Sequence, residues 1–75
     1  MAQSHVTTLM ITNADGRSAD AQLTHEEAYD LAQLLKRLSW SELRVCAASD
    51  DEAFQMRVAA NKLQDTLARA GYAPR

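Results

Sequence analysis

Along this chain of 75 residues, apolar positions first alternate every second residue and then recur at spacings of three and four. Residues 5–12, HVTTLMIT, alternate between polar and apolar and are rich in β-branched side chains, which is typical of a strand. Residues 18–23, SADAQL, alternate in the same way. The NADG between them contains Gly16, which adopts a positive φ without steric cost. The pattern therefore predicts an N-terminal β-hairpin.

The alternation gives each predicted strand an apolar face. Leu9 and Ile11 share one face of the first strand, while Val6 and Met10 lie on the other. In the second strand, Ala19, Ala21 and Leu23 share one face, opposite Ser18, Asp20 and Gln22. A two-stranded hairpin alone is only marginally stable in water. We therefore expect helices to cover its faces and a partner strand to be available to its edges.

Three helix starts follow the hairpin, each with the pattern of a capping box. In this motif a Ser or Thr oxygen accepts the backbone N–H three residues later, and a Glu at that position reaches back. The three matches are Thr24 with Glu27, Ser39 with Glu42, and Ser49 with Glu52. They predict helices over about 25–38, 40–48 and 50–70. Gly71 provides a left-handed C-cap, Tyr72 folds back on the last turn, and Pro74 prevents continuation.

Apolar positions at spacings of three and four give each helix a buried stripe. The inward positions are Ala28, Leu31, Leu35 and Leu38 in the first helix, Trp40, Leu43 and Ala47 in the second, and Ala53, Met56, Ala60, Leu63, Leu67 and Ala70 in the third. Phe54 and Val58 form a flanking stripe on the third helix. The result is an α+β fold, an N-terminal β-hairpin followed by three helices (ββααα), the middle helix short and the last one long. Residues 1–75 form one small domain, with 1–4 expected to be disordered.

Composition narrows the class of protein. A chain with one cysteine has no internal disulfide, and its N-terminus lacks a basic segment followed by a long apolar run, so we expect a cytoplasmic protein without a membrane span. The net charge is −2, but residues 1–35 carry −4 and residues 36–75 carry +2. These halves complement each other electrostatically, which is equally compatible with a contact inside the fold, between two copies or with another partner. The open hairpin edges and the extra apolar stripe predict a homodimer.

Residues 39–54, SWSELRVCAASDDEAF, have the spacing of a helix-turn-helix but not its chemistry. The second helix would place Asp50, Asp51 and Glu52 against the DNA backbone, whereas binding usually relies on Lys and Arg that neutralise phosphates. These acids suit the positive end of the helix dipole instead. We therefore interpret the short helix as a corner. A nucleic-acid accessory role remains the alternative, through a diffuse basic surface comprising Lys36, Arg37, Arg44, Arg57, Lys62 and Arg69.

Catalysis is not expected. Cys46 is the one thiol, and a nucleophilic role would need His5, at the start of a strand, or His25, in the first turn of a helix. We expect Cys46 to be buried as a small apolar residue, and a small enzyme that uses it as nucleophile is the third hypothesis. No His, Cys or acidic residues have metal-ligand spacing, and neither glycine belongs to a phosphate-binding loop. We predict no catalytic residue, no metal and no cofactor.

Several motifs in the segment from Leu23 to Arg75 carry a family resemblance. They are Glu27-Ala28, LAQLLKR at 31–37, WSELR at 40–44, DEAFQMR at 51–57 and the terminal AGYAPR. In these motifs the chain resembles a family of short uncharacterised proteins encoded on proteobacterial plasmids and integrative conjugative elements. The resemblance implies an accessory protein of a mobile element, which binds and inhibits or modulates a host protein. An anti-defence inhibitor of the anti-CRISPR type is an alternative that this context implies.

The leading hypothesis is thus a non-catalytic protein-binding module. Its candidate contact surfaces are the polar face of the last helix and the acidic first turns of the first helix. The candidate partner-binding residues are Glu26, Glu27, Asp30, Arg57, Asn61, Lys62 and Gln64.

Overall fold

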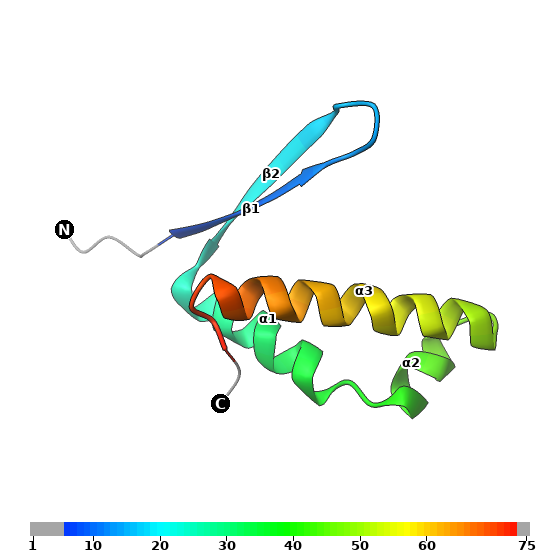
Figure 1. The fold of residues 1–75 in the computed structure, drawn as a ribbon. Helices are drawn as coiled ribbons and strands as arrows, with labels where there is room; N and C mark the ends of the chain where they lie inside the picture. The colour runs from blue at the N-terminus through cyan, green and yellow to red at the C-terminus, as the bar shows by residue number, and fades with distance from the viewer. Residues whose placement is uncertain (1–5, 74–75) are drawn as a thin grey trace.

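A computed structural model describes residues 6–73 of the chain (Figure 1). The elements in order are β1 (Val6–Thr12), β2 (Ser18–Thr24), α1 (His25–Arg37), α2 (Trp40–Cys46) and α3 (Asp50–Arg69). The predicted α+β fold is confirmed, with a hairpin, a short middle helix and a long last helix. The expectations for residues 1–4, His5 and Pro74 fall outside the described residues.

The hairpin closes through the NADG turn. The Asn13 N–H donates to the Arg17 carbonyl at 2.9 Å, and the Gly16 N–H donates to the Asn13 carbonyl at 3.0 Å. Gly16 adopts φ +85°, as the turn requires. The turn sets an antiparallel register in which Leu9 lies opposite Ala21 and Ile11 opposite Ala19. The predicted apolar face is therefore shared by both strands.

Two of the three predicted capping boxes form. Thr24 and Ser39 each accept the N–H of the residue three positions on, and Glu27 and Glu42 accept the N–H of the cap residue. At α3 the prediction is wrong in one part. Ser49 accepts the Glu52 N–H at 3.2 Å, but the Glu52 carboxylate accepts the N–H of Ala48 at 2.8 Å. Because the chain turns tightly between α2 and α3, the Glu52 carboxylate binds the N–H of Ala48 instead of the N–H of Ser49.

The C-terminus of α3 is closed by a Schellman motif. Gly71 adopts φ +102°, its N–H donates to the Ala68 carbonyl at 3.0 Å, and the Tyr72 N–H donates to the Leu67 carbonyl at 2.8 Å. This geometry confirms the predicted cap. It also turns Tyr72 back against the helices, where its side chain is only 5% exposed.

Tyr72 joins three elements of the fold. Its hydroxyl hydrogen-bonds with the Thr7 hydroxyl of β1 and with Nδ1 of His25, the first residue of α1, at 2.6 Å for the latter. Its ring lies 5.0 Å from the Tyr29 ring and 5.2 Å from the His25 ring, both in edge-to-face orientation. The base of the hairpin, the start of α1 and the end of α3 are therefore held at one point.

The core consists of small and medium-sized residues. Ala28 and Ala32 of α1 and Ala53 of α3 have no exposed surface, and Leu35 and Leu67 are almost fully buried. Alanines at a helix contact allow the backbones to approach closely. α2 adds the buried Leu43 and lies across the far end of α3 from the hairpin (Figure 1). The short helix thus forms a corner, as predicted.

The hairpin is covered only at its base. Thr7, Leu9 and Leu23 are half-buried, and a small pocket separates this part of the sheet from the C-terminal half of α3. From Met10 to Gln22 every residue is exposed. In Figure 1 the hairpin leaves the helices at an angle, so that its turn lies well away from them. The expectation that the helices cover the whole sheet is therefore correct only for its proximal half.

Among the described residues, no helix combines the length and the apolar character needed to cross a membrane.

Candidate functional site

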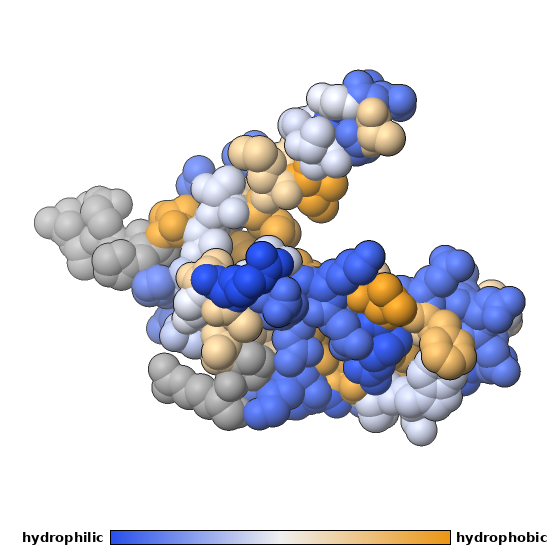
Figure 2. Space-filling view, viewed as in Figure 1, coloured by the Kyte–Doolittle hydropathy of each residue, from blue (hydrophilic) through white to orange (hydrophobic). Residues whose placement is uncertain are grey.

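Three exposed apolar side chains form a patch at the α2–α3 corner. Trp40 is the first residue of α2, and its ring centroid lies 5.1 Å from that of Phe54 in the second turn of α3. Val58 follows Phe54 one turn later on the same side of the helix. The three are 41%, 63% and 49% exposed, respectively. We call these residues the corner patch, and Figure 2 shows orange apolar surface among polar residues on the outer side of α3.

The corner patch continues into an open, shallow groove along α3. Its lining residues are Phe54, Gln55, Val58, Ala59 and Lys62. Most of this lining is apolar, and Lys62 contributes the one ionisable group. Contiguous exposed apolar surface with a polar rim is typical of protein contact sites. The groove is therefore suited to an apolar side chain accompanied by a carboxylate.

The patch corrects one prediction. We expected Trp40 to point inward, whereas its side chain is exposed. The reason is the shortness of α2, which buries Leu43 against the helices and has room for little else. The rings of Trp40 and Phe54 then cover each other at the surface. The sequence signal was the flanking stripe formed by Phe54 and Val58, which the structure leaves exposed.

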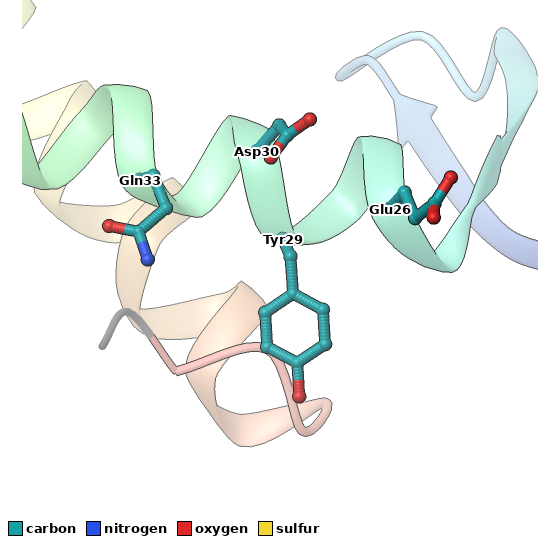
Figure 3. Close-up of a pocket in the computed structure, with 4 residues that line it drawn as sticks. All are labelled: Glu26, Tyr29, Asp30 and Gln33. Atoms are coloured by element: carbon teal, nitrogen blue, oxygen red, sulfur yellow. The ribbon is translucent and has the colours of Figure 1, made fainter.

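The acidic candidates lie in the first turns of α1, outside the corner patch. Glu26 and Asp30 line a shallow depression together with Tyr29 and Gln33 (Figure 3). Figure 3 shows Tyr29 reaching toward the C-terminal turn, while the two carboxylates extend away from it. Carboxylates arranged in this way do not converge on a common point, so they do not form an acid–base pair.

Glu27, the third acidic candidate, acts within the fold. Its Oε1 accepts the Thr24 N–H at 2.8 Å as half of the capping box. A carboxylate in this position satisfies a helix donor and is favoured by the helix dipole. Glu27 is therefore explained by helix capping.

The α3 candidates do not form one exposed face. Arg57 is half-buried, and its Nη2 donates to the Leu38 carbonyl at 3.0 Å, which ties the end of α1 to α3. Gln64 is also half-buried and lies beside a depression shared with Asn61. Only Lys62 lies beside the corner patch. The predicted polar face was wrong in treating Arg57 and Gln64 as exposed, because they flank the buried stripe of the helix.

The basic residues of the nucleic-acid alternative are partly used in local interactions. Arg44 donates to Asp50 at 2.6 Å and to the Ala47 carbonyl at 3.1 Å, and Arg69 donates to Asp65 at 2.9 Å. Arg57 is bound to the Leu38 carbonyl, as described above. Lys36 and Arg37 lie in the last turn of α1, where cations stabilise the helix dipole. These contacts place several of the six cations in structural roles.

Cys46 is exposed at the end of α2, so its predicted burial is wrong. Cys46 is the last residue of α2, three positions after Leu43, the one buried residue of this short helix. Within residues 6–73, no three His, Cys, Asp or Glu side chains are grouped so that they could hold a metal ion.

Comparison with known proteins gives one result. No curated protein and no solved structure matches the chain. A family model matches residues 1–75, and its description is a family of unknown function, DUF7706. This agrees with the resemblance to uncharacterised proteins noted from the motifs. Because the match covers the whole sequence, the chain belongs to the family of unknown function DUF7706.

Proposed function

We propose that this protein is a non-catalytic protein-binding module that docks its partner at the corner patch. The observation that carries the proposal is the contact between Trp40 and Phe54, which leaves two large rings and Val58 exposed as one continuous surface. Burying such side chains is the main driving force of most protein association. Trp is also among the residue types that contribute most to binding when buried.

The groove beside the patch indicates the chemistry of the partner. An apolar side chain of the partner fills the groove between Phe54 and Val58, and a carboxylate pairs with Lys62 at its end. Lys62 is thus the one residue of our original candidates that stays in the proposed contact surface. A neighbouring charge of this kind affects the rate of association and the choice of partner more than the affinity.

The mobile-element context adds the class of partner. A small accessory protein of a plasmid or integrative element that binds a host protein inhibits or modulates that protein without chemistry of its own. Inhibition of a bacterial defence complex, as by an anti-CRISPR protein, is one form of this function. The support for the context is the resemblance of motifs such as WSELR and DEAFQMR, which contain Trp40 and Phe54 of the corner patch.

A pull-down from the native host tests the docking surface. The bait is the tagged full chain, compared with the Phe54→Ser/Val58→Ser variant and with Val45→Ser as a matched control. Val45 is 86% exposed on α2 and lies outside the patch, so its replacement removes apolar surface elsewhere. Each lysate is divided into nuclease-treated and untreated halves, and the captured proteins are identified by mass spectrometry.

We expect a near-stoichiometric protein that survives nuclease, is retained by Val45→Ser and is lost with the double variant. Because Trp40 is the only tryptophan, its emission reports the same contact directly when the purified partner is added. Enrichment that disappears with nuclease would favour the basic-surface alternative. Capture that the double variant leaves intact would remove the corner patch from the proposal.

A further inference from the structure

The distal half of the hairpin has apolar residues on one face, as a buried strand does, but no other element of the described chain packs against that face. One face of the sheet, which we call the inner face, contains Thr7, Leu9, Ile11, Ala19, Ala21 and Leu23. Its proximal end contacts Tyr72 and shares a small pocket with the C-terminal half of α3, but Ile11 is 66% exposed and Ala19 is also exposed. Apolar alternation of this kind normally marks a strand face that is buried along its whole length. Something outside the described chain is expected to cover it.

The edge of β1 is open in the same region. Hydrogen-bonded and non-hydrogen-bonded pairs alternate along an antiparallel ladder. Asn13 and Arg17 form a hydrogen-bonded pair, and every second residue of β1 counted back from Asn13 does the same. The backbone groups of Leu9 and Ile11 are therefore hydrogen-bonded to β2. The N–H and C=O groups of Thr8 and Met10 consequently face away from β2. They form an edge without a partner among the described residues.

The two edge strands of the hairpin differ in the features that prevent pairing with another chain. Natural proteins block an edge strand with a charge, a proline or a bulge. β1, VTTLMIT, contains none of these, whereas β2 has Asp20 near its middle. An uncharged edge rich in β-branched residues is suited to pairing with another strand. The sequence therefore distinguishes β1 as the pairing edge.

We propose that β1 pairs with β1 of a second copy of this chain, antiparallel, about a two-fold axis that passes beside Leu9. The product is a four-stranded sheet in the order β2–β1–β1–β2. This proposal is independent of the corner patch, because β1 lies at the C-terminal end of α3 and the patch lies near its N-terminal end (Figure 1).

The register follows from the exposed backbone groups. Pairing centred on Leu9 places Thr8 opposite Met10 of the second copy, so the outward groups of both strands bond to each other. Leu9 then lies opposite Leu9 of the second copy in a non-hydrogen-bonded pair, where side chains approach most closely. Residues with odd numbers stay on the inner face in both copies. Leu9 thus meets Leu9, and Ile11 meets Thr7, without any change in either hairpin.

The same arrangement covers the distal inner face. A two-fold axis perpendicular to the sheet keeps both inner faces on one side and places the two helical bodies at opposite ends. Ile11 of one copy then lies beside Thr7 of the other, over the end of the second α3. One contact thereby provides both the missing edge partner and the missing cover.

The chemistry of the surface favours a second copy as the occupant. β1 carries no charge, so two identical strands meet without repulsion. Three or more strands with an apolar face are needed for independent sheet stability, and pairing of two hairpins supplies four. Stable specific interfaces bury about 1,200–2,000 Å² in total. The strand edge alone is narrow, and the covered distal face widens the contact.

Sedimentation velocity of the full chain tests the assembly. We expect a dimer at about 50 μM, in the range of weak to moderate dimer affinities. Met10→Lys places a charge at the proposed edge and should weaken the dimer at least tenfold. Gln22→Lys is the matched control, because Gln22 has the same outward position on β2 and is exposed. It should leave the dimer unchanged, and circular dichroism checks that both variants fold.

Cysteine cross-linking tests the register in a Cys46→Ala background. Leu9→Cys places two thiols opposite each other, at the Cα separation of about 4.5–5.5 Å that disulfides and non-hydrogen-bonded pairs share. Ile11→Cys is the control on the same face. In this register its two copies lie four residues apart along the strands, about 13 Å, which is too far for a disulfide.

We expect rapid cross-linking of Leu9→Cys and at least tenfold slower cross-linking of Ile11→Cys. A wild-type chain that stays monomeric at about 200 μM would overturn the proposal. A dimer that Met10→Lys does not weaken, or one that cross-links equally at both positions, would also overturn it. Trp40 emission should stay constant when the dimer is diluted, and a change would place the dimer contact at the corner patch instead.

Discussion

Removing the hydroxyl of Tyr72 tests whether this residue holds the hairpin to the helices. The Tyr72→Phe variant keeps the ring and its contacts with Tyr29 and His25 but removes both hydrogen bonds of the hydroxyl. A hydrogen bond contributes about 1 kcal/mol net, and its loss leaves Thr7 and His25 without that partner. Because the site is partly buried, we expect the free energy of unfolding to fall by about 1–2 kcal/mol.

That loss is large for so small a domain. The core of a chain below about 80 residues supplies only about 3–5 kcal/mol, so Tyr72→Phe removes a substantial part of it. For a domain of this size, each kcal/mol corresponds to about 4–8 °C in the melting temperature. The expected decrease is therefore about 5–15 °C.

Urea unfolding followed by far-ultraviolet circular dichroism measures this effect. All variants are compared at one protein concentration, because self-association would make stability concentration-dependent. Tyr29→Phe is the matched control, since its hydroxyl donates to the Gly71 carbonyl at 3.2 Å at an exposed position. We expect it to cost less than about 0.5 kcal/mol. Equal stability of Tyr72→Phe and the wild type would refute the assigned role of the hydroxyl.

Two further predictions concern the ends of helices. Gly71→Ala should destabilise the domain by about 1–2 kcal/mol in urea unfolding, because φ is +102° and open space around the new Cβ leaves only the conformational cost; an unchanged midpoint would contradict this. At α2, hydrogen bonds from the Ser39 backbone N–H and then from its hydroxyl lower the pKa of Glu42. Because the pKa is lower in the folded state, the Glu42 carboxylate stabilises the fold at pH values above the unfolded-state pKa of about 4.3. This stabilisation is lost as the pH falls through the folded-state pKa. Melting temperatures between pH 7 and pH 3 should therefore show Glu42→Gln less stable than the wild type at neutral pH, with a difference that shrinks as the pH falls below about 4.3. A difference that stays constant over this range would refute the linkage.

Local rules accounted for most of the backbone. Alternation with a glycine turn predicted the hairpin, and the Ser or Thr with a Glu three residues later located each helix start to within a residue. These signals lie within a few residues of one another, so they do not depend on the rest of the fold. Gly71 was assigned its positive φ for the same reason.

Exposure was less predictable because it depends on distances between elements. Trp40 and Cys46 were expected to be buried, yet α2 is too short to bury more than Leu43. Arg57 was treated as a surface cation, although the close approach of α1 and α3 brings it to the Leu38 carbonyl. Of the candidate site, the sequence thus indicated Lys62 and the Phe54–Val58 stripe, but not the contact between Phe54 and Trp40.

Because the helix contact is made by alanines, enlarging a core residue there is more harmful than truncating it, whereas truncation is the more harmful change in most cores. Ala28, Ala32 and Ala53 are the only described residues with no exposed surface, and no large side chain is fully buried. Truncation at these positions has little to remove, whereas each added methyl group has to displace a neighbouring backbone, at about 1–3 kcal/mol for overpacking. The domain is therefore limited by the thickness of its helix contact: larger residues do not fit between the backbones, and glycine, the only smaller residue, costs about 1 kcal/mol in helix propensity.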